Sequence, residues 1–305
     1  MSDVNDWVVV RANSRNVARR ARARETSARA VDMNDGREPS RVEQLAEPSR
    51  VEQLAEPRER RRERARAIAA ALAKAHEDVM KSHAIALAIA RVVREVKARR
   101  RGRGVTLATL GSGSPGASAA ARAQLGFAKA LALRMKEEFV DVIVRIRVVE
   151  PCLTIVDEEA IALAFAGTEA TTEASASDGA SESASDGRED IVVYYMPHCE
   201  GDLYEAVLRA RWSASGLKDF VCIGNTFATY VDRWAARTVD PEKKRPSRVI
   251  AAAAIAESTL VDPGDKFTVQ GAFNDTSVMT FSGTDVFEAL DVDFEALRVD
   301  AKREE

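Results

Sequence analysis

The sequence contains no run of about 18 apolar residues, so no segment predicts a membrane-spanning helix. The first residues lack the apolar core of a signal peptide, and Asp3 and Asp6 lie where transit peptides carry few acids. Cysteine is scarce, because Cys152, Cys199 and Cys222 are the only three in 305 residues. So few cysteines do not form a disulfide framework, and they predict reduced thiols. Together these absences predict a protein of the nucleus and cytoplasm.

Catalytic signatures are also missing. The sequence has no P-loop, no H-E-x-x-H, no Ser-x-His-type triad signature and no C-x-x-C pair. His198 and the three cysteines have no zinc-finger spacing, so we predict no metal site. The sequence identifies no catalytic residue and no cofactor. It therefore favours a protein that is not an enzyme, while leaving the question open.

Charge is divided unevenly along the chain. Residues 1–104 hold 25 Lys and Arg against 15 Asp and Glu, whereas the remainder holds 20 against 33. By composition, residues 1–57 form a disordered basic arm that contains a perfect tandem repeat, SRVEQLAEP at 40–48 and again at 49–57. Such an arm is usually solvated, and the alternatives are contact with nucleic acid, an import receptor or the acidic body. Away from the arm we expect no nucleic-acid binding.

Residues 58–101 contain neither glycine nor proline and form a basic amphipathic helical region of one or two helices. Apolar residues recur there at spacings of three, four and seven: Ile68, Leu72, Ala75, Val79, Ile85, Ile89, Val92 and Val96. Pro57 and Gly102 are the expected boundaries. The basic clusters 58–66 and 99–103 are either nuclear-import signals or solvated helix ends.

Residues 102–300 alternate apolar runs with helical segments, which predicts βαβ units. The expected fold class is α/β, with a Rossmann-like, mainly parallel sheet and helices on both faces. Strands are expected at 105–110, 140–149, 191–196, 220–223 and 278–281, and helices at 118–138, 157–165, 202–210, 226–237 and 286–290.

Three segments of this region are less regular. Residues 167–190 are Ser, Ala, Thr, Gly and acids, which predicts a disordered acidic loop. Residues 248–260 are apolar and alanine-rich, and the pattern does not decide between helix and strand. Residues 301–305 form a charged tail.

The informative feature is where the polar residues fall. A polar cluster directly follows each of the first four strands, and a parallel sheet brings its carboxyl ends to one edge. We therefore expect a common ligand pocket there. Its candidate residues are Gly111, Ser112, Gly113, Ser114, Glu150, His198, Cys199, Asn225 and Thr226, with Asn274 and Asp275 from a later turn.

Two of these clusters suggest a nucleotide or S-adenosylmethionine-type ligand. The turn Gly111–Ser114 leads into a helix, whose first N–H groups can hold an anion, and Glu150 ends the next strand, where such folds bind ribose. Against this, the full G-x-G-x-x-G is absent, and glycines in such turns are often only structural.

His198 is the only histidine within 102–300, and Pro197 stiffens the turn before it. It is either a base or pH-sensitive group, or it holds a neighbouring loop in place. Cys222 lies inside a strand and is expected to be a core residue. Asn225, Asn274 and Asp275 are candidate turn caps.

The motif blocks resemble those of the Sensitivity to Red light Reduced family. The central block comprises Tyr195-Met196-Pro197-His198-Cys199, Leu203-Tyr204, Arg211-Trp212-Ser213 and Ile223-Gly224-Asn225-Thr226-Phe227. The opening turn at 110–114 with Gln124-Leu125, the closing block 272–277 and the N-terminal Trp7–Val10 are similar as well.

The resemblance implies a regulatory protein in circadian clock input and red-light (phytochrome) signalling, with protein partners and a possible link to haem metabolism. It also implies nuclear and cytoplasmic placement and supplies no catalytic residues. Two departures stand out. Glu150 replaces an Asp, and the acidic loop occupies the place of a strand and an acidic turn, so the sequence predicts that both are missing.

Overall fold

The computed structural model describes residues 56–173, 190–235, 247–264, 267–269 and 271–282. Several predictions fall outside these ranges. They are the arm before residue 56 with its tandem repeat, residues 174–189 of the acidic loop, the helix at 286–290 and the tail at 301–305.

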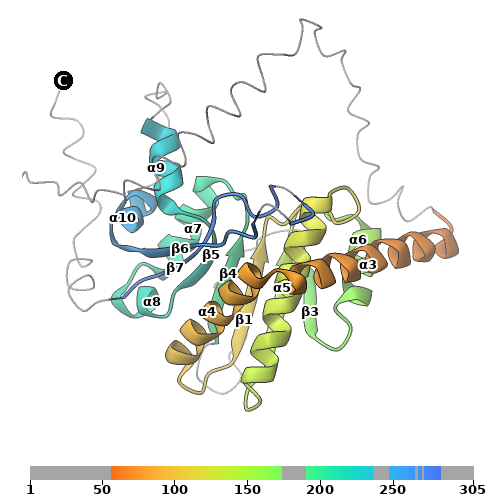
Figure 1. Cartoon of the computed structure of the whole chain (residues 1–305), viewed down its shortest axis with the longest axis horizontal. Helices are drawn as coiled ribbons and strands as arrows, with labels where there is room; N and C mark the ends of the chain where they lie inside the picture. The colour runs from red at the N-terminus through yellow and green to blue at the C-terminus, as the bar shows by residue number, and fades with distance from the viewer. Residues whose placement is uncertain (1–55, 174–189, 236–246, 265–266, 270, 283–305) are drawn as a thin grey trace, which may run out of the picture. The chain divides into compact units, whose positions relative to one another are not determined.

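A seven-stranded sheet forms the centre of the protein, in the order β3-β2-β1-β4-β5-β7-β6 (Figure 1). The first five strands in that order are mutually parallel, and β7 and β6 complete the sheet in antiparallel pairing. The strands are β1 Val105–Leu110, β2 Val144–Val149, β3 Glu169–Glu173, β4 Ile191–Met196, β5 Val221–Asn225, β6 Glu257–Leu260 and β7 Thr276–Thr280. The predicted α/β class with a mainly parallel sheet is confirmed, although β2 begins four residues later than expected.

Helices cover both faces, as predicted. They are α3 Arg58–Lys81, α4 His83–Arg100, α5 Ala119–Glu138, α6 Ile155–Ala164, α7 Gly201–Arg211, α8 Ala214–Lys218, α9 Phe227–Ala235 and α10 Ser247–Ile255. One apolar cluster joins the sheet to α3, α4 and α5, and a second joins its other face to α7, α9 and α10. Strands β1 and β4 contribute alternate residues to the two clusters, as the two-residue period of a strand requires.

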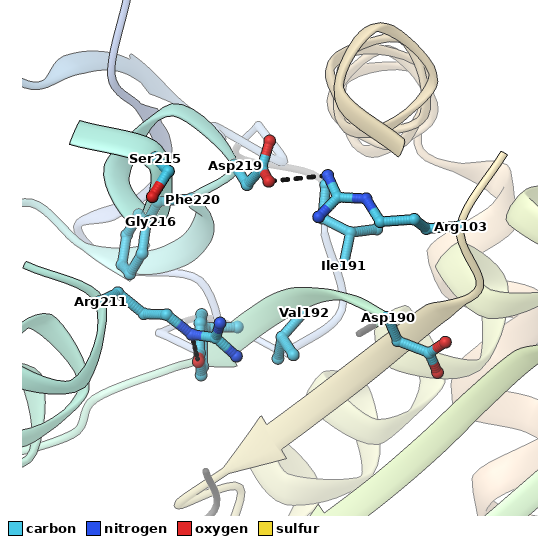
Figure 2. Close-up of a pocket in the computed structure, with 10 residues that line it drawn as sticks. Arg103, Asp190, Ile191, Val192, Arg211, Ser215, Gly216, Asp219 and Phe220 are labelled. Carbon is cyan, nitrogen blue, oxygen red and sulfur yellow. Dashed lines mark hydrogen bonds and ion pairs between the residues drawn. The ribbon is translucent and has the colours of Figure 1, made fainter. Parts of the chain in front are cut away.

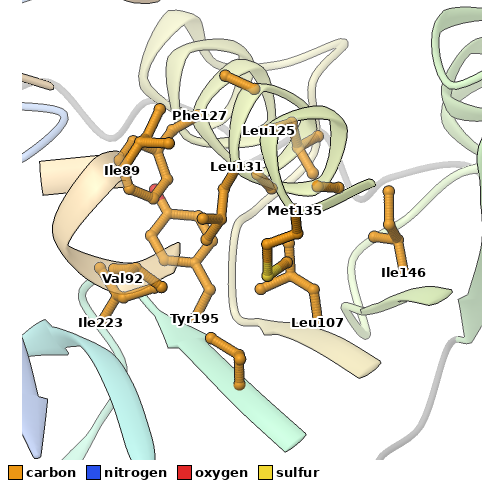
Figure 3. Packing of buried hydrophobic residues seen from close by; sticks show 14 of the residues in the cluster. Ile89, Val92, Leu107, Leu125, Phe127, Leu131, Met135, Ile146, Tyr195 and Ile223 are labelled. Carbon is orange, nitrogen blue, oxygen red and sulfur yellow. The ribbon is translucent and has the colours of Figure 1, made fainter. Parts of the chain in front are cut away.

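The N-terminal helical region is two helices, and its inner face belongs to the core of the α/β domain. Ser82 ends α3 and caps α4, because its hydroxyl accepts a hydrogen bond from the Ile85 N–H at 3.4 Å. Ile89 and Val92 pack beside Phe127 and Tyr195 (Figure 3). The sequence placed a boundary between residues 101 and 102, but the apolar core of the α/β domain includes residues from both sides of that boundary.

The acidic loop prediction is wrong at its beginning, because Glu169–Glu173 form β3, parallel to β2. The strand that seemed missing is therefore present. It carries no apolar run, since it is an edge strand held by main-chain pairing and by ion pairs. Arg147 bonds Glu173 at 2.8 Å, and Arg145 lies 3.7 Å from Glu169.

The undecided segment 248–260 contains both structures, α10 followed by β6. A distant residue starts the helix, because the Glu205 carboxylate on α7 accepts the N–H groups of Arg248 and Val249 at 2.8 and 3.1 Å. That cap lies more than forty residues away in sequence, so local periodicity did not reveal it.

No helix in the described part of the chain is long and apolar enough to cross a bilayer.

Candidate functional site at the carboxyl edge of the sheet

The order in which the chain adds strands to the sheet reverses between β1 and β4. After β1 the chain moves outward through β2 to β3, and it then returns to build β4 on the other side of β1. In open α/β sheets, ligands bind outside the carboxyl ends of the strands at such a switch point. We refer to the turns that follow β1, β2, β4 and β5 as the rim.

The turns after β1 and β2 are joined by Glu150. Its buried carboxylate accepts a hydrogen bond from the Gly113 N–H at 2.7 Å and one from the Cys152 N–H at 3.0 Å. Both carboxylate oxygens are therefore bonded to backbone of the rim.

The turns after β1 and β4 touch through Cys199. Its thiol donates to the Leu110 carbonyl at 3.3 Å. A Cβ atom at Gly111 would lie 2.6 Å from the Cys199 sulfur, and Gly111 has a φ of +66°. Glycine is required at this position by both the close contact and the left-handed backbone.

The turns after β4 and β5 are joined by Asn225 and Tyr204. The buried Asn225 side chain accepts the His198 N–H at 3.3 Å. The Tyr204 hydroxyl donates to the Met196 carbonyl at 2.6 Å and accepts the Asn225 N–H at 2.9 Å. One phenol from α7 thus fixes the ends of two strands.

His198 extends this network to the loop before β7. Its Nε2 lies 3.1 and 3.3 Å from the carbonyl oxygens of Gly271 and Ala272. Because carbonyls only accept, Nε2 carries a hydrogen, and Nδ1 is the basic nitrogen of the neutral ring. His198 has a φ of +56°, an uncommon conformation for a residue other than glycine. Strain of this kind concentrates at functional sites.

The structure therefore brings together six of the predicted site residues: Gly111, Gly113, Glu150, His198, Cys199 and Asn225. Ser114 instead bonds Asp157 of α6 at 2.8 Å, and the Thr226 hydroxyl bonds Thr229 in the first turn of α9. Asn274 and Asp275 are exposed, and Asp275 lies 3.7 Å from Arg233. They belong to the loop that His198 holds, on its outer side.

Burial keeps the Cys199 thiol and two tyrosine hydroxyls at or beside the rim in their neutral, protonated forms. Burial, with smaller contributions from Glu150 and Glu200, raises the pKa of the Cys199 thiol to about 12. Burial also raises the pKa of the hydroxyls of Tyr195 and Tyr204 well above its usual value. A thiol that stays protonated is a poor nucleophile. The rim therefore offers hydrogen bonds and shape, together with the exposed imidazole of His198.

Three backbone N–H groups in the turn before α5 already have side-chain partners within the protein. Glu150 takes that of Gly113, and Asp157 takes that of Gly116 at 2.8 Å. The Ser114 hydroxyl takes that of Ala117 at 3.2 Å. A phosphate that accepted the Gly113 N–H would have to replace the Glu150 carboxylate.

Sequence reasoning did not select several residues that matter here. Asp157 and Gln124 were missed because they bond residues that lie far along the chain. The Gln124 side-chain amide, for example, donates a hydrogen bond to the Ala272 carbonyl at 2.9 Å.

Four buried hydroxyls on or beside the rim have no hydrogen-bond partner among the described residues: Thr109, Ser112, Tyr195 and Thr276. Thr109 lies opposite Tyr195, and Thr276 opposite Asn225. Buried unpaired hydroxyls of this kind call for a partner such as a ligand or water.

A pocket of about 240 Å³ lies at the amino ends of β4 and β5, the opposite edge from the rim. The residues that the sequence predicted to line a ligand pocket lie together at the rim. The pocket at the amino edge of the sheet is lined by other residues (Figure 2).

The fold and its rim define an α/β protein of Rossmann-like topology whose motif-bearing turns meet at the switch point of the sheet. The model of the SRR1 domain family matches residues 79–280, which include α4 and all seven strands. The chain belongs to this family. It is also 26% identical over 162 residues to Protein SENSITIVITY TO RED LIGHT REDUCED 1 of Arabidopsis thaliana. That alignment covers 51% of this chain and 52% of the relative, so the chain spans about half the length of the curated relative it matches.

Proposed function

We propose that this protein is a regulatory protein of red-light signalling and circadian clock input. We further propose that it works in the nucleus and cytoplasm through protein partners or a small ligand bound at the rim. Membership of the SRR1 domain family supports the regulatory role, and the name of the Arabidopsis relative supports the link with red light. The family resemblance supports the circadian clock input, the nuclear and cytoplasmic location and a connection with haem metabolism.

The observation that carries the role of the rim is the convergence of its turns. Glu150, Cys199 and Asn225 each bond the backbone of a neighbouring turn. Such a network holds the edge rigid, as recognition requires. The neutral thiol and phenols favour binding over covalent chemistry.

His198 is the best residue with which to test this proposal, because it is exposed while its backbone is fixed. In the His198→Asn variant the backbone keeps its left-handed conformation, which Asn tolerates, and the imidazole is lost. His83→Asn is the matched control, since His83 is exposed at the start of α4, outside the rim.

The experiment deletes the gene in its own organism and restores it as wild type, His198→Asn or His83→Asn. We expect deletion to reduce red-light responses and to alter the circadian period. Wild type and His83→Asn should restore both, and His198→Asn should not. Unchanged rhythm and light responses after deletion would refute the signalling role. Full rescue by His198→Asn would refute the role of the rim.

A Rossmann-like enzyme or sensor that binds a nucleotide or S-adenosylmethionine is the alternative. The position of Glu150 at the end of β2, next to the Gly111 turn, favours it. It predicts thermal stabilisation by such a ligand, about 2.7 kcal/mol at a concentration of 100 times Kd, and a loss of this shift in Glu150→Gln. Absence of any shift across a panel of nucleotides and S-adenosylmethionine would count against it.

A further inference from the structure

The excess positive charge in the first third of the chain belongs to α3, α4 and the turn after them. Residues 1–57 hold 10 Lys and Arg against 10 Asp and Glu, whereas residues 58–104 hold 15 against 5. This second stretch contains the two basic clusters found in the sequence, 58–66 and 99–103. The two clusters differ in what their arginines contact.

Three arginines of the cluster 99–103 are used within the fold. Each of them bonds a carboxylate, and these ion pairs are Arg99 with Glu95, Arg100 with Asp141 and Arg103 with Asp219. Figure 2 shows the pair of Arg103 and Asp219, which joins the segment before β1 to the end of α8. Because opposite charges within ion pairs largely cancel, this cluster leaves little charge for a partner.

The cluster 58–66 is different, because most of its charge faces solvent. Four of its six arginines are exposed and have no acidic partner among the described residues: Arg58, Arg60, Arg62 and Arg66. Of these, Arg58, Arg62 and Arg66 recur every four residues, so they follow one side of α3 in steps of about 6 Å.

The opposite side of this segment fixes α3 to the domain. Ala65 is buried against Val156 and Ala160 of α6, and Arg61 bonds Glu159 of the same helix at 2.9 Å. Figure 1 shows α3 running past α5 to α6. The exposed arginines therefore lie on a helix that is already ordered, so that less conformational entropy is lost when they bind a partner than in a flexible tail.

The surface of this segment argues against two other partners of basic helices. A helix that binds a membrane interface needs large apolar side chains beside its basic ones, and the exposed residues of 58–67 are Arg, Glu and Ala only. An import receptor that takes a basic peptide in extended form would have to detach the segment from α6. Guanidinium groups on an ordered helix suit phosphates, which they bind through two parallel N–H groups.

We propose that Arg58, Arg60, Arg62 and Arg66, the arginine face, bind the phosphate backbone of a nucleic-acid duplex. Contacts with phosphates position a duplex but carry no sequence information, so binding is independent of sequence. The sequence alone limited nucleic-acid contact to residues 1–57, and this surface lies outside that range.

The charge of the remaining chain restricts the duplex to this end of the domain. Residues 105–305 hold 20 Lys and Arg against 33 Asp and Glu, which repel phosphates. The arginine face shares no residue with the rim, so this proposal and the function proposed for the rim stand or fall separately.

A fluorescein-labelled DNA duplex of mixed sequence is the probe, and its anisotropy is followed as the full chain is added at salt concentrations from about 50 to 200 mM. The logarithm of the association constant falls with the logarithm of the salt concentration, by about 0.9 per phosphate contacted. The triple variant Arg58→Gln, Arg62→Gln and Arg66→Gln should therefore reduce this slope by about 3 and weaken binding about tenfold or more at low salt. Glutamine is a good helix former, so α3 is retained, which circular dichroism checks.

Two further variants separate local contacts from overall charge. Arg94→Gln, Arg101→Gln and Arg209→Gln together are the matched control, since these arginines are also exposed and the same charge is removed away from the arginine face. The control should keep the wild-type slope. Replacing Arg58, Arg62 and Arg66 by Lys keeps the charge and should keep most of the slope, because lysine also releases counterions.

Equal slopes in the two glutamine variants would mean attraction by overall charge and would overturn the proposal. So would the absence of saturable binding to the duplex, or a lysine variant that binds as weakly as the glutamine variant. Saturable binding of poly-glutamate without binding of the duplex would assign the arginine face to an acidic protein partner instead.

Discussion

Tyr204→Phe tests most directly whether one phenol holds the rim together. The ring is buried against Phe227 and Tyr230, with centroids 5.9 and 5.1 Å away, so phenylalanine fills the same space. The substitution removes only the oxygen that joins the Met196 carbonyl to the Asn225 N–H.

The expected cost follows from the groups left behind. A buried backbone group that loses its partner costs about 1–3 kcal/mol, and two groups are affected here. Because the surroundings relax in part, we expect the free energy of unfolding to fall by about 2–4 kcal/mol. For a domain of this size that corresponds to a fall in Tm of about 5–12 °C.

The assay is urea unfolding followed by circular dichroism, with Tyr194→Phe as the matched control. The Tyr194 hydroxyl accepts from Arg211, a partly exposed side chain that can turn to water. We expect Tyr194→Phe to cost less than about 1 kcal/mol. If both variants lost the same free energy, the reasoning about Tyr204 would be refuted.

Four further predictions concern neighbouring contacts. Gly111→Ala should lower the free energy of unfolding by about 1–3 kcal/mol, because the added Cβ meets the Cys199 sulfur. In a double-mutant cycle, Cys199→Ala in the same chain should recover part of this loss, and strictly additive effects would contradict the prediction. Because the Cys199 pKa is raised from 9.0 to about 12, its stabilising effect is complete below pH 9 and lost as pH rises toward 12. Wild type should therefore lose more stability than Cys199→Ala between pH 9 and pH 12 in denaturant titrations, and parallel curves would refute it. At pH 8, iodoacetamide should modify the exposed Cys152 well before Cys199, as measured by mass spectrometry; equal rates would show that Cys199 is accessible. Asp157→Asn should lower the free energy of unfolding by about 2–4 kcal/mol, because the buried carboxylate bonds Ser114, Gly116 and Thr154; a change below about 0.5 kcal/mol in urea unfolding would refute that role.

Parts of the candidate site were predictable because they depend on connectivity alone. Parallel strands end at one edge, so residues that directly follow β1, β2, β4 and β5 have to meet there. Glu150, His198 and Asn225 were found this way. Ser114 and Thr226 also follow strands, but their side chains turn to α6 and α9. The direction in which a side chain points at the end of a strand depends on local backbone geometry, and the spacing of residues in the sequence does not reveal that geometry.

The sequence by itself predicted most of the strands and helices in their order, the parallel character of the sheet and the edge at which the motifs gather. Each of these follows from periodicity and chain direction, which are local properties. Only the tertiary structure decided that 169–173 form a strand, that α3 and α4 complete the core, and that Glu205 starts α10. These features depend on partners far along the chain, whose contacts exist only once the molecule has folded. For the same reason the pocket at the amino ends of β4 and β5 was not predictable from the sequence, because its wall is assembled from segments that meet only in the folded protein.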